Sequence, residues 1–366
     1  MNKPFFLPTL LTVLCLTAGT TRSYAQEMGF EEYDPTPTLV VPVHEIKQAK
    51  FPFVDIHSHH RDMSEARLRQ LVGEMDAMNE AVMVNLSGGS GAALKEKIDA
   101  INTTYPNRFM VFANVDFDGV GTPGWGERAA AQLEEDIRYG AKGLKIFKSL
   151  GLRYTDANGK RLAVDDPRLD PIWAKCGEMG VPVLIHAADP KSFWEPMDAK
   201  NERWLELKTH PRRKRTDTDP APWEQIIQEQ HNVFKKHPNT LFINAHMGWF
   251  ANDLETLGRL LDEMPNMYVG IAAVIAELGR QPQQARAFFV NYQDRILFGK
   301  DSYRPEEFPT YFRVLESNDE YFPYYKKYHA FWAMYGLNLP DTVLQKVYHG
   351  NAQKLIPALD NALFVE

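Results

Sequence analysis

One stretch of the sequence gathers residue types that bind metals. Residues 51–60 read FPFVDIHSHH, an apolar run that ends in three histidines. Alternate residues of a strand share a face, so Asp55, His57 and His59 would point the same way. Neutral imidazole is a common ligand of zinc and similar ions. Alone, the stretch is as typical of an ordinary polar strand end as of a metal site, so the question is whether the chain supplies further ligands.

The pattern of the whole chain predicts how such ligands would meet. After residue 50, short apolar runs alternate with longer amphipathic stretches. The runs span residues 53–57, 81–85, 108–115, 143–147, 182–186, 241–246, 267–273 and 295–299. The helical patterns span residues 64–79, 92–105, 127–139, 171–179, 222–236, 253–264, 282–292 and 341–348. Eight such alternations, with strands that lack polar alternation, predict an α/β fold, a (β/α)8 TIM barrel over residues 51–366.

An open doubly wound sheet is the alternative architecture. Its first βα turn would carry a glycine fingerprint, and this chain has none there. The glycine-rich stretch SGGSG at 87–91 has the spacing of neither a dinucleotide loop nor a phosphate loop, and it predicts a flexible loop. Two connections are long, from 189 to about 221 after the fifth strand and from 302 to about 340 after the eighth. Long loops at the carboxyl ends of barrel strands usually shape the active site.

Chemically active side chains stand where a barrel places its catalytic groups. His57 and His59 end the first strand, and Lys145 lies near the end of the fourth. The fifth, sixth and eighth strands end at or just before three further residues, which are His186, His246 and Asp301. None of these types is needed for packing at a strand end. Their shared register turns the opening stretch into a predicted metal site.

These motifs resemble the amidohydrolase superfamily of metal-dependent enzymes. The resemblance is greatest to the branch that includes aminocarboxymuconate-semialdehyde decarboxylase. It rests on DIHSH at 55–59, LKIF at 144–147, LIHA at 184–187, AHMG at 245–248, GKDS at 299–302 and GNA at 350–352. The set is specific as a whole, although each piece alone is weak. GKDS departs from the more usual GTD or GSD, and Lys300 is expected to point away from the metal.

The resemblance implies a role for each strand-end residue. The metal ligands it implies are His57, His59, His186 and Asp301. His246 would handle protons in a one-metal enzyme or bind a second metal in a two-metal enzyme. Lys145 would either bind substrate or, if carboxylated, bridge two metals. The expected cofactor is a divalent metal, with zinc favoured.

Two reactions are compatible with this site. The main expectation is hydrolysis of an ester, lactone or amide-type bond by metal-activated water, with Asp301 and His246 as catalytic groups. The alternative is a metal-dependent non-oxidative decarboxylase of a small aromatic or unsaturated acid. Asp189, Trp249 and Tyr303 follow catalytic strands and are expected to contact substrate. Arginines that could bind a substrate carboxylate are Arg153, Arg203 and Arg304, none of which lies in a recognisable motif.

The amino terminus and the composition bound the setting of the protein. Residues 1–25 read as a signal peptide with a small-x-small site before Gln26, and residues 26–50 as a polar lead-in. We therefore expect export to the periplasm or outside the cell, with no membrane insertion after cleavage, and this favours hydrolysis. The net charge of −7 over 366 residues argues against nucleic acid. Only Cys176 follows the signal peptide, as a buried thiol. The expected partners are a small-molecule substrate and a second copy in a homodimer.

Overall fold

The structure, a computed structural model, describes residues 28–29, 32–326 and 329–364. The predicted signal peptide lies outside these described residues. The described residues from Thr38 onwards form one compact unit, and the described residues before Thr38 group separately. Part of the predicted lead-in therefore belongs to the barrel unit, where the Ala49 N–H donates to the Met78 carbonyl at 3.1 Å. In the described part of the chain, no helix is both long and apolar enough to cross a membrane.

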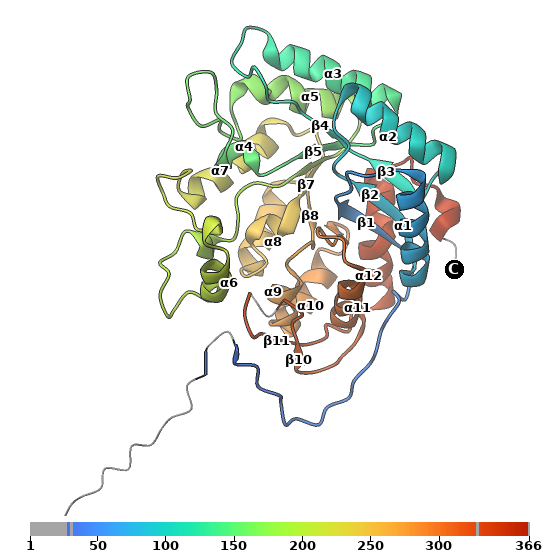
Figure 1. The fold of residues 1–366 in the computed structure, drawn as a ribbon, viewed down its shortest axis with the longest axis vertical. Coiled ribbons are helices and arrows are strands. Elements are labelled where there is room, and N and C mark those ends of the chain that lie inside the picture. Colours follow the sequence, from blue (N-terminus) through green and yellow to red (C-terminus); the bar gives the residue numbers. More distant parts are fainter. Residues whose placement is uncertain (1–27, 30–31, 327–328, 365–366) are drawn as a thin grey trace, which may run out of the picture. The chain divides into compact units, whose positions relative to one another are not determined.

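Parallel strands form a closed barrel in two hydrogen-bonded groups (Figure 1). The first group is β1 (Phe53–Ser58), β2 (Glu80–Asn85) and β3 (Phe109–Val111). The second is β4 (Ala113–Asn114), β5 (Leu144–Ile146), β6 (Val183–Ile185), β7 (Phe242–Asn244), β8 (Met267–Gly270) and β9 (Ile296–Leu297). β3 and β4 are two pieces of the predicted third strand. The barrel closes where Ser58 pairs in parallel with Asp301 and the Ile56 N–H donates to Phe298 at 3.2 Å. The predicted (β/α)8 fold is confirmed.

Helices follow the strands at the predicted places. They are α1 (Glu65–Met78), α2 (Gly91–Thr104), α3 (Trp125–Tyr139), α5 (Asp170–Met179), α7 (Trp223–Lys236), α8 (Leu254–Glu263), α10 (Pro282–Asn291) and α12 (Asp341–Gln345). A π-helical turn (Lys346–Gly350) and α13 (Asn351–Leu355) follow α12. Local chemistry sets several ends. The Asp253 side chain accepts the Thr256 N–H at the start of α8, and Pro282 occupies the first turn of α10.

The two long connections contain secondary structure of their own. The connection after β6 contains α6 (Trp204–Thr209). The connection after β9 contains α11 (Phe308–Glu316) and an antiparallel pair, β10 (Phe322–Pro323) with β11 (Ala333–Met334). Two further short helices, α4 (Ser149–Leu152) and α9 (Ile275–Gly279), follow β5 and β8. These pieces build the rim at the carboxyl ends of the strands.

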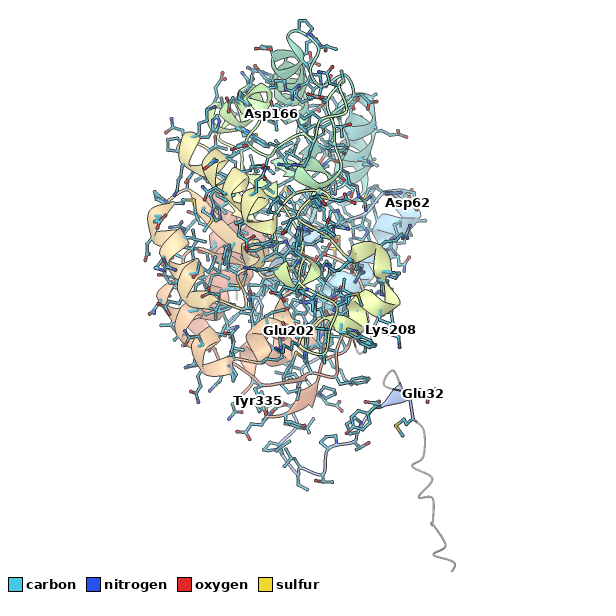
Figure 2. The ribbon with its side chains drawn as sticks, turned by 90° about the vertical axis from the view of Figure 1, so that its left-hand side faces the viewer. Glu32, Asp62, Asp166, Glu202, Lys208 and Tyr335 are labelled. Carbon is cyan, nitrogen blue, oxygen red and sulfur yellow. The ribbon has the colours of Figure 1, made fainter. Side chains whose placement is uncertain are left out.

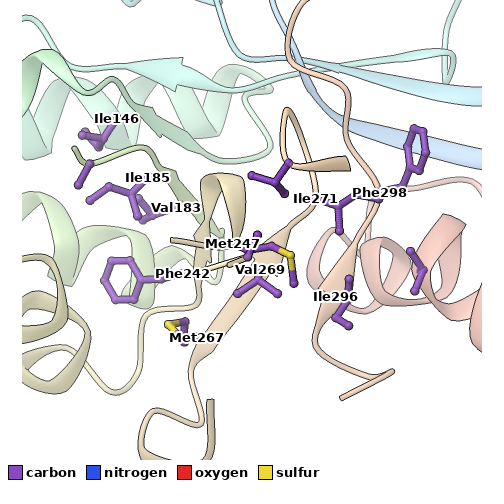
Figure 3. Close-up of a cluster of buried hydrophobic side chains, with 14 of the residues drawn as sticks. Ile146, Val183, Ile185, Phe242, Met247, Met267, Val269, Ile271, Ile296 and Phe298 are labelled. Atoms are coloured by element: carbon purple, nitrogen blue, oxygen red, sulfur yellow. The ribbon is translucent and has the colours of Figure 1, made fainter. Parts of the chain in front are cut away.

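Apolar side chains fill both faces of the barrel wall. One face lines the interior with residues such as Val54, Val82 and Leu184. The other packs against the helices, and Figure 3 shows Val183, Phe242 and others of this layer. Cys176 is buried as predicted, and burial raises the pKa of its thiol. Charged side chains such as Asp62 and Lys208 lie exposed at the periphery (Figure 2). The core therefore holds the strands rigidly, and polar groups at their ends stand out as exceptions.

Candidate metal centre

The predicted ligands converge at the carboxyl end of the barrel. The Nε2 atoms of His57 and His59 each lie 3.7 Å from Oδ1 of Asp301. The pairing of Ser58 with Asp301 brings these two strand ends together, and the Asp301 N–H donates to the His57 carbonyl at 2.7 Å. Ligand atoms of His57, His246 and Asp301 all lie within 4.8 Å of one another. Residues far apart in sequence thus form one cluster, as the register predicted.

His186 and His246 form a hydrogen-bonded pair beside this cluster. Nδ1 of His246 donates to the Ala272 carbonyl at 2.7 Å, which leaves a lone pair on its Nε2. That Nε2 lies 3.1 Å from Nδ1 of His186, which must then be the donor. Nε2 of His186 is left buried, with no partner among the described residues. The converging triad contains His246 rather than His186, so the role of His186 as a ligand stays a prediction.

Burial keeps these imidazoles neutral at physiological pH. It lowers the pKa of His57 and His186 well below the ordinary value of 6.5. It lowers the pKa of His59 and His246 to about 4. Burial alone would raise the pKa of Asp301, but His246, His59 and nearby lysines bring it below the ordinary value. Neutral imidazole and ionised carboxylate are the forms that bind a cation.

The donor set suits a divalent cation. Both ring nitrogens of His57 and Nε2 of His186 are buried without a hydrogen-bond partner in the described chain. A buried polar atom without a partner costs free energy, and a bound cation would satisfy the one lone pair that each neutral imidazole carries. Three imidazoles with one carboxylate are typical ligands of zinc and of related transition metals. The residues present therefore fit a divalent metal.

Lys145 stands inside the cluster rather than on its edge. Its side chain is 1% exposed, and its Nζ has no hydrogen-bond partner in the described part of the structure. Burial lowers the pKa of Lys145 to about 7, against the opposing influence of Asp301. A fraction of this lysine is thus neutral near pH 7 and could react or ligate. Whether it binds substrate or becomes carboxylated stays a prediction.

Asp55 supports the ligands and does not join them. Its Oδ1 accepts the N–H groups of His57 at 2.9 Å and of Lys300 at 3.0 Å. One carboxylate oxygen therefore fastens the ends of β1 and β9, beside Asp301. The Lys300 side chain turns away, as predicted, and pairs with Glu307.

The three predicted substrate contacts have different surroundings. The Trp249 ring stacks on His246, with centroids 4.6 Å apart, and its Nε1 donates to the Ala187 carbonyl at 3.0 Å. Asp189 is 3% exposed and forms ion pairs with Lys148 and Arg215. The Tyr303 ring packs against His60 with centroids 5.0 Å apart. Only Trp249 is thus brought to the cluster, and substrate binding by Asp189 and Tyr303 stays an unsupported prediction.

A left-handed turn positions His246 and Trp249, and sequence reasoning missed it. The φ angles from His246 to Trp249 are 57°, 52°, 62° and 64°. Left-handed backbone costs roughly 1–2 kcal/mol per non-glycine residue. A Cβ on Gly248 would lie 2.4 Å from Nδ2 of Asn244, so this turn also requires glycine there. Backbone strain of this kind clusters at functional sites.

The substrate arginines expected from sequence are placed elsewhere. Arg203 is buried between Glu206 and Glu277, and the side chain of Arg304 is 65% exposed. Arg153 lies exposed after α4. A different arginine, Arg61, lines a cavity of about 620 Å³ beside His59. Its place two residues after His59 is the one sequence signal that could have identified it.

Comparison with known proteins gives the family and the fold. Residues 54–358 match the amidohydrolase family. An uncharacterised TIM-barrel protein from Bordetella bronchiseptica is 18% identical, with a TM-score of 0.51 over 83% of this chain and 98% of that chain. A dihydroxybenzoic acid decarboxylase from a Polaromonas species, with manganese and the inhibitor 2-nitroresorcinol, is 14% identical, with a TM-score of 0.53 over 86% and 100%. A 2,6-dihydroxybenzoate decarboxylase in complex with 2,6-dihydroxybenzoate is 14% identical, with a TM-score of 0.50 over 85% and 99%.

At these identities the solved structures show a shared fold. No curated protein matches the chain. The family match covers nearly all of the barrel, from β1 to the segment after α13. It includes every residue of the cluster described above. The chain belongs to the amidohydrolase family.

Proposed function

We propose that this chain is a metal-dependent, non-oxidative decarboxylase of a small aromatic or unsaturated carboxylic acid. The observation that carries the proposal is the cluster of neutral imidazoles with one carboxylate, beside a cavity whose lining has no Asp or Glu. In this cluster both ring nitrogens of His57 and Nε2 of His186 have no hydrogen-bond partner among the described residues. A site of this kind attracts an anionic substrate. Two proteins of the same fold are named as dihydroxybenzoate decarboxylases, which supports the proposal. The hydrolase expected from sequence would use the same residues.

Four residues of the chain would hold the cation, which are His57, His59, His186 and Asp301. When bound, the cation would supply fixed positive charge for the carboxylate or hydroxyl oxygens of the substrate. Zinc is the metal expected from the residue types, whereas the Polaromonas structure contains manganese. Metal analysis of the purified chain distinguishes the two.

The remaining residues would manage charge and the proton. The protonated fraction of Lys145 places positive charge beside the substrate oxygens. When the bond from the substrate carbon to the carboxylate breaks, its electron pair stays on that carbon and carbon dioxide leaves. Asp301 or Nε2 of His246 would then pass a proton, taken from a substrate hydroxyl or from solvent, to the carbon. Stacking of Trp249 on His246 keeps that imidazole in place.

The test combines metal analysis with two product assays. The mature chain is offered aromatic acids, esters, lactones and amides, while carbon dioxide release and hydrolysis are followed together. We expect a bound divalent metal and release of carbon dioxide from an aromatic or unsaturated acid. Asp301→Asn should lower that rate about 100-fold or more, because it removes a proton carrier and a ligand. Asp62→Asn, a change of an exposed carboxylate on the loop after β1, is the control.

Several outcomes would contradict the proposal. Hydrolysis of an ester, lactone or amide without release of carbon dioxide would favour the hydrolase instead. Full turnover and full metal content in Asp301→Asn would contradict the proposed roles of Asp301 as metal ligand and proton carrier. Chelation should lower the melting temperature, since a ligand of the native state stabilises it, and an unchanged melting curve would argue against a bound metal.

A further inference from the structure

A cavity opens on one side of the metal centre. Its volume is about 620 Å³, and it lies among the segments that follow β1, β2, β4 and β5. Its lining consists of His59, Arg61, Ser87, Gly89, Lys97, Asn114 and Phe147. Because His59 belongs to the metal centre, a molecule in this cavity would reach the centre as well. The two charged side chains of the lining are both cations.

Neither cation forms an ion pair with a carboxylate of the described residues, although the charge of the neighbouring Glu96 acts on Lys97. Arg61 forms no ion pair or hydrogen bond among the described residues, and its side chain is exposed. Nζ of Lys97 donates to two carbonyl oxygens, those of Ser87 at 3.0 Å and Gly88 at 2.8 Å. An ammonium group has three donors, so one N–H of Lys97 remains for a ligand. Carbonyl partners hold this charge in place without cancelling it.

The glycine-rich loop at residues 87–91, which contributes Ser87 and Gly89 to the cavity lining, is held by side-chain hydrogen bonds, and its predicted flexibility stays a prediction. The Gly89 N–H donates to Oδ1 of Asn114 at 2.8 Å, and Nδ2 of Asn114 donates to the Leu86 carbonyl at 3.0 Å. The Gly91 N–H donates to Oδ1 of Asp136 at 2.9 Å. These backbone donors are therefore not free to cradle a phosphate. The charged donors of the lining are one guanidinium and one ammonium N–H, which match the two oxygens of a carboxylate.

One wall of the cavity is aromatic. The Phe147 side chain is 36% exposed, and its ring centroid lies 5.5 Å from that of His59. An exposed phenyl ring next to a metal-centre imidazole suits the flat body of an aromatic or conjugated molecule. The cavity thus offers an apolar face near the metal centre and positive charge from Arg61 and Lys97.

We propose that this cavity binds a second carboxylate, so that the substrate is a planar dicarboxylic acid. One carboxylate would react at the metal centre, and Arg61 with Lys97 would bind the other. The inference rests on the proposed decarboxylase function and adds the class of substrate to it. It makes Arg61 a specificity-determining residue, although Arg61 takes no part in the chemistry.

The test measures binding separately from turnover. Isophthalate, a planar dicarboxylate, and benzoate, its monocarboxylate counterpart, are titrated calorimetrically into the metal-loaded mature chain. We expect isophthalate to bind at least tenfold more tightly than benzoate. Arg61→Gln should remove that advantage and change benzoate binding less than twofold. Arg69→Gln is the matched control, because Arg69 is exposed on α1 and, within the described part of the chain, pairs only with Glu65, at 2.6 Å.

The outcomes separate the inference from the proposed function. Equal affinity for the two acids, or an unchanged preference in Arg61→Gln, would overturn the second carboxylate subsite. Inorganic phosphate that binds as tightly as isophthalate, and is lost equally in Arg61→Gln, would overturn the assignment to a carboxylate. A strong preference for isophthalate without any release of carbon dioxide would keep the subsite and reject the decarboxylase. If dicarboxylates do turn over, Arg61→Gln should raise KM about tenfold and leave kcat within twofold.

Discussion

The two sides of the rim at the carboxyl ends of the strands differ in whether their charged side chains form ion pairs. On the side of β6 to β8, which we call the closed side, buried charges are paired. Asp189 pairs with Lys148 and Arg215, and its carboxylate has little access to solvent. Arg203 is buried as well and pairs with two carboxylates of its own, Glu206 and Glu277. Charges on this side are already used to hold the rim together.

On the side of β1 to β5, which we call the open side, three cations form no ion pair with a carboxylate of the described residues. Arg61, Lys97 and Lys145 face the cavity or the metal centre, and the lining of the cavity has no Asp or Glu. A buried pair satisfies itself, whereas an unpaired cation beside a cavity is available to a ligand. The difference teaches that partners, more than residue type, separate structural charges from functional ones.

The largest expected effect follows from breaking a pair on the closed side. Arg203→Met leaves Glu277 buried without its cation, whereas Glu206 keeps an ion pair with Arg213. We expect the free energy of unfolding to fall by about 3–5 kcal/mol, because an uncompensated buried charge is costly. Arg61→Met, on the open side, should change it by no more than about 0.5 kcal/mol. Urea unfolding measures both, and similar losses in the two variants would contradict the contrast.

The second-largest effect is expected where the barrel closes, at the contact between β9 and β1. A Cβ on Gly299 would lie 2.9 Å from Cβ of His57, so Gly299→Ala must push His57, a predicted metal ligand, aside. We expect a loss of about 1–3 kcal/mol in stability from overpacking, together with reduced metal content. The measurements are thermal melting and metal analysis of the purified variant.

A glycine on a helix provides the control for that substitution. A Cβ on Gly73 in α1 meets nothing within 4 Å, so Gly73→Ala should keep the metal and raise stability slightly. If Gly299→Ala kept full metal content and stability, the close contact between β9 and β1 would not position His57.

The sequence predicted what depends on local pattern and missed what depends on distant partners. The barrel and the convergence of His57, His246 and Asp301 follow from strand register, because the carboxyl ends of parallel strands meet at one rim. The sequence predicted that Arg203 could bind a substrate carboxylate, but Arg203 pairs with Glu277, which lies 74 residues away in the sequence. Arg61 carried no signal except its nearness to His59.

The left-handed turn at the end of β7 was beyond sequence reasoning for another reason. Positive φ is rare for His246, Met247 and Trp249, and only Gly248 hinted at it. Such strain persists because surrounding contacts enforce it, such as the stacking of Trp249 on His246. Local propensity therefore predicts the wrong backbone at the residues that matter for function.

The smallest expected effect is a loss of folding stability in acid, caused by a buried histidine on the closed side. His231 on α7 is buried, with its ring centroid 6.2 Å from that of Phe250, which follows Trp249. Burial lowers the pKa of His231 from 6.5 to about 4; Lys235 lowers it further, and Glu263 opposes this. Above pH 6.5 both folded and unfolded chains leave it neutral. As the pH falls towards 4, only the unfolded chain gains the proton, so folding stability is lost in that window.

The matched variant His231→Phe cannot gain this proton. Between pH 7 and pH 5.5, wild type should lose about 1 kcal/mol more of its free energy of unfolding than His231→Phe. The other buried histidines, such as His59 and His246, titrate in both proteins and cancel in the difference. Urea unfolding at the two pH values gives that difference. Parallel losses would show that the closed side opens enough to hydrate His231, and would weaken its contrast with the open side.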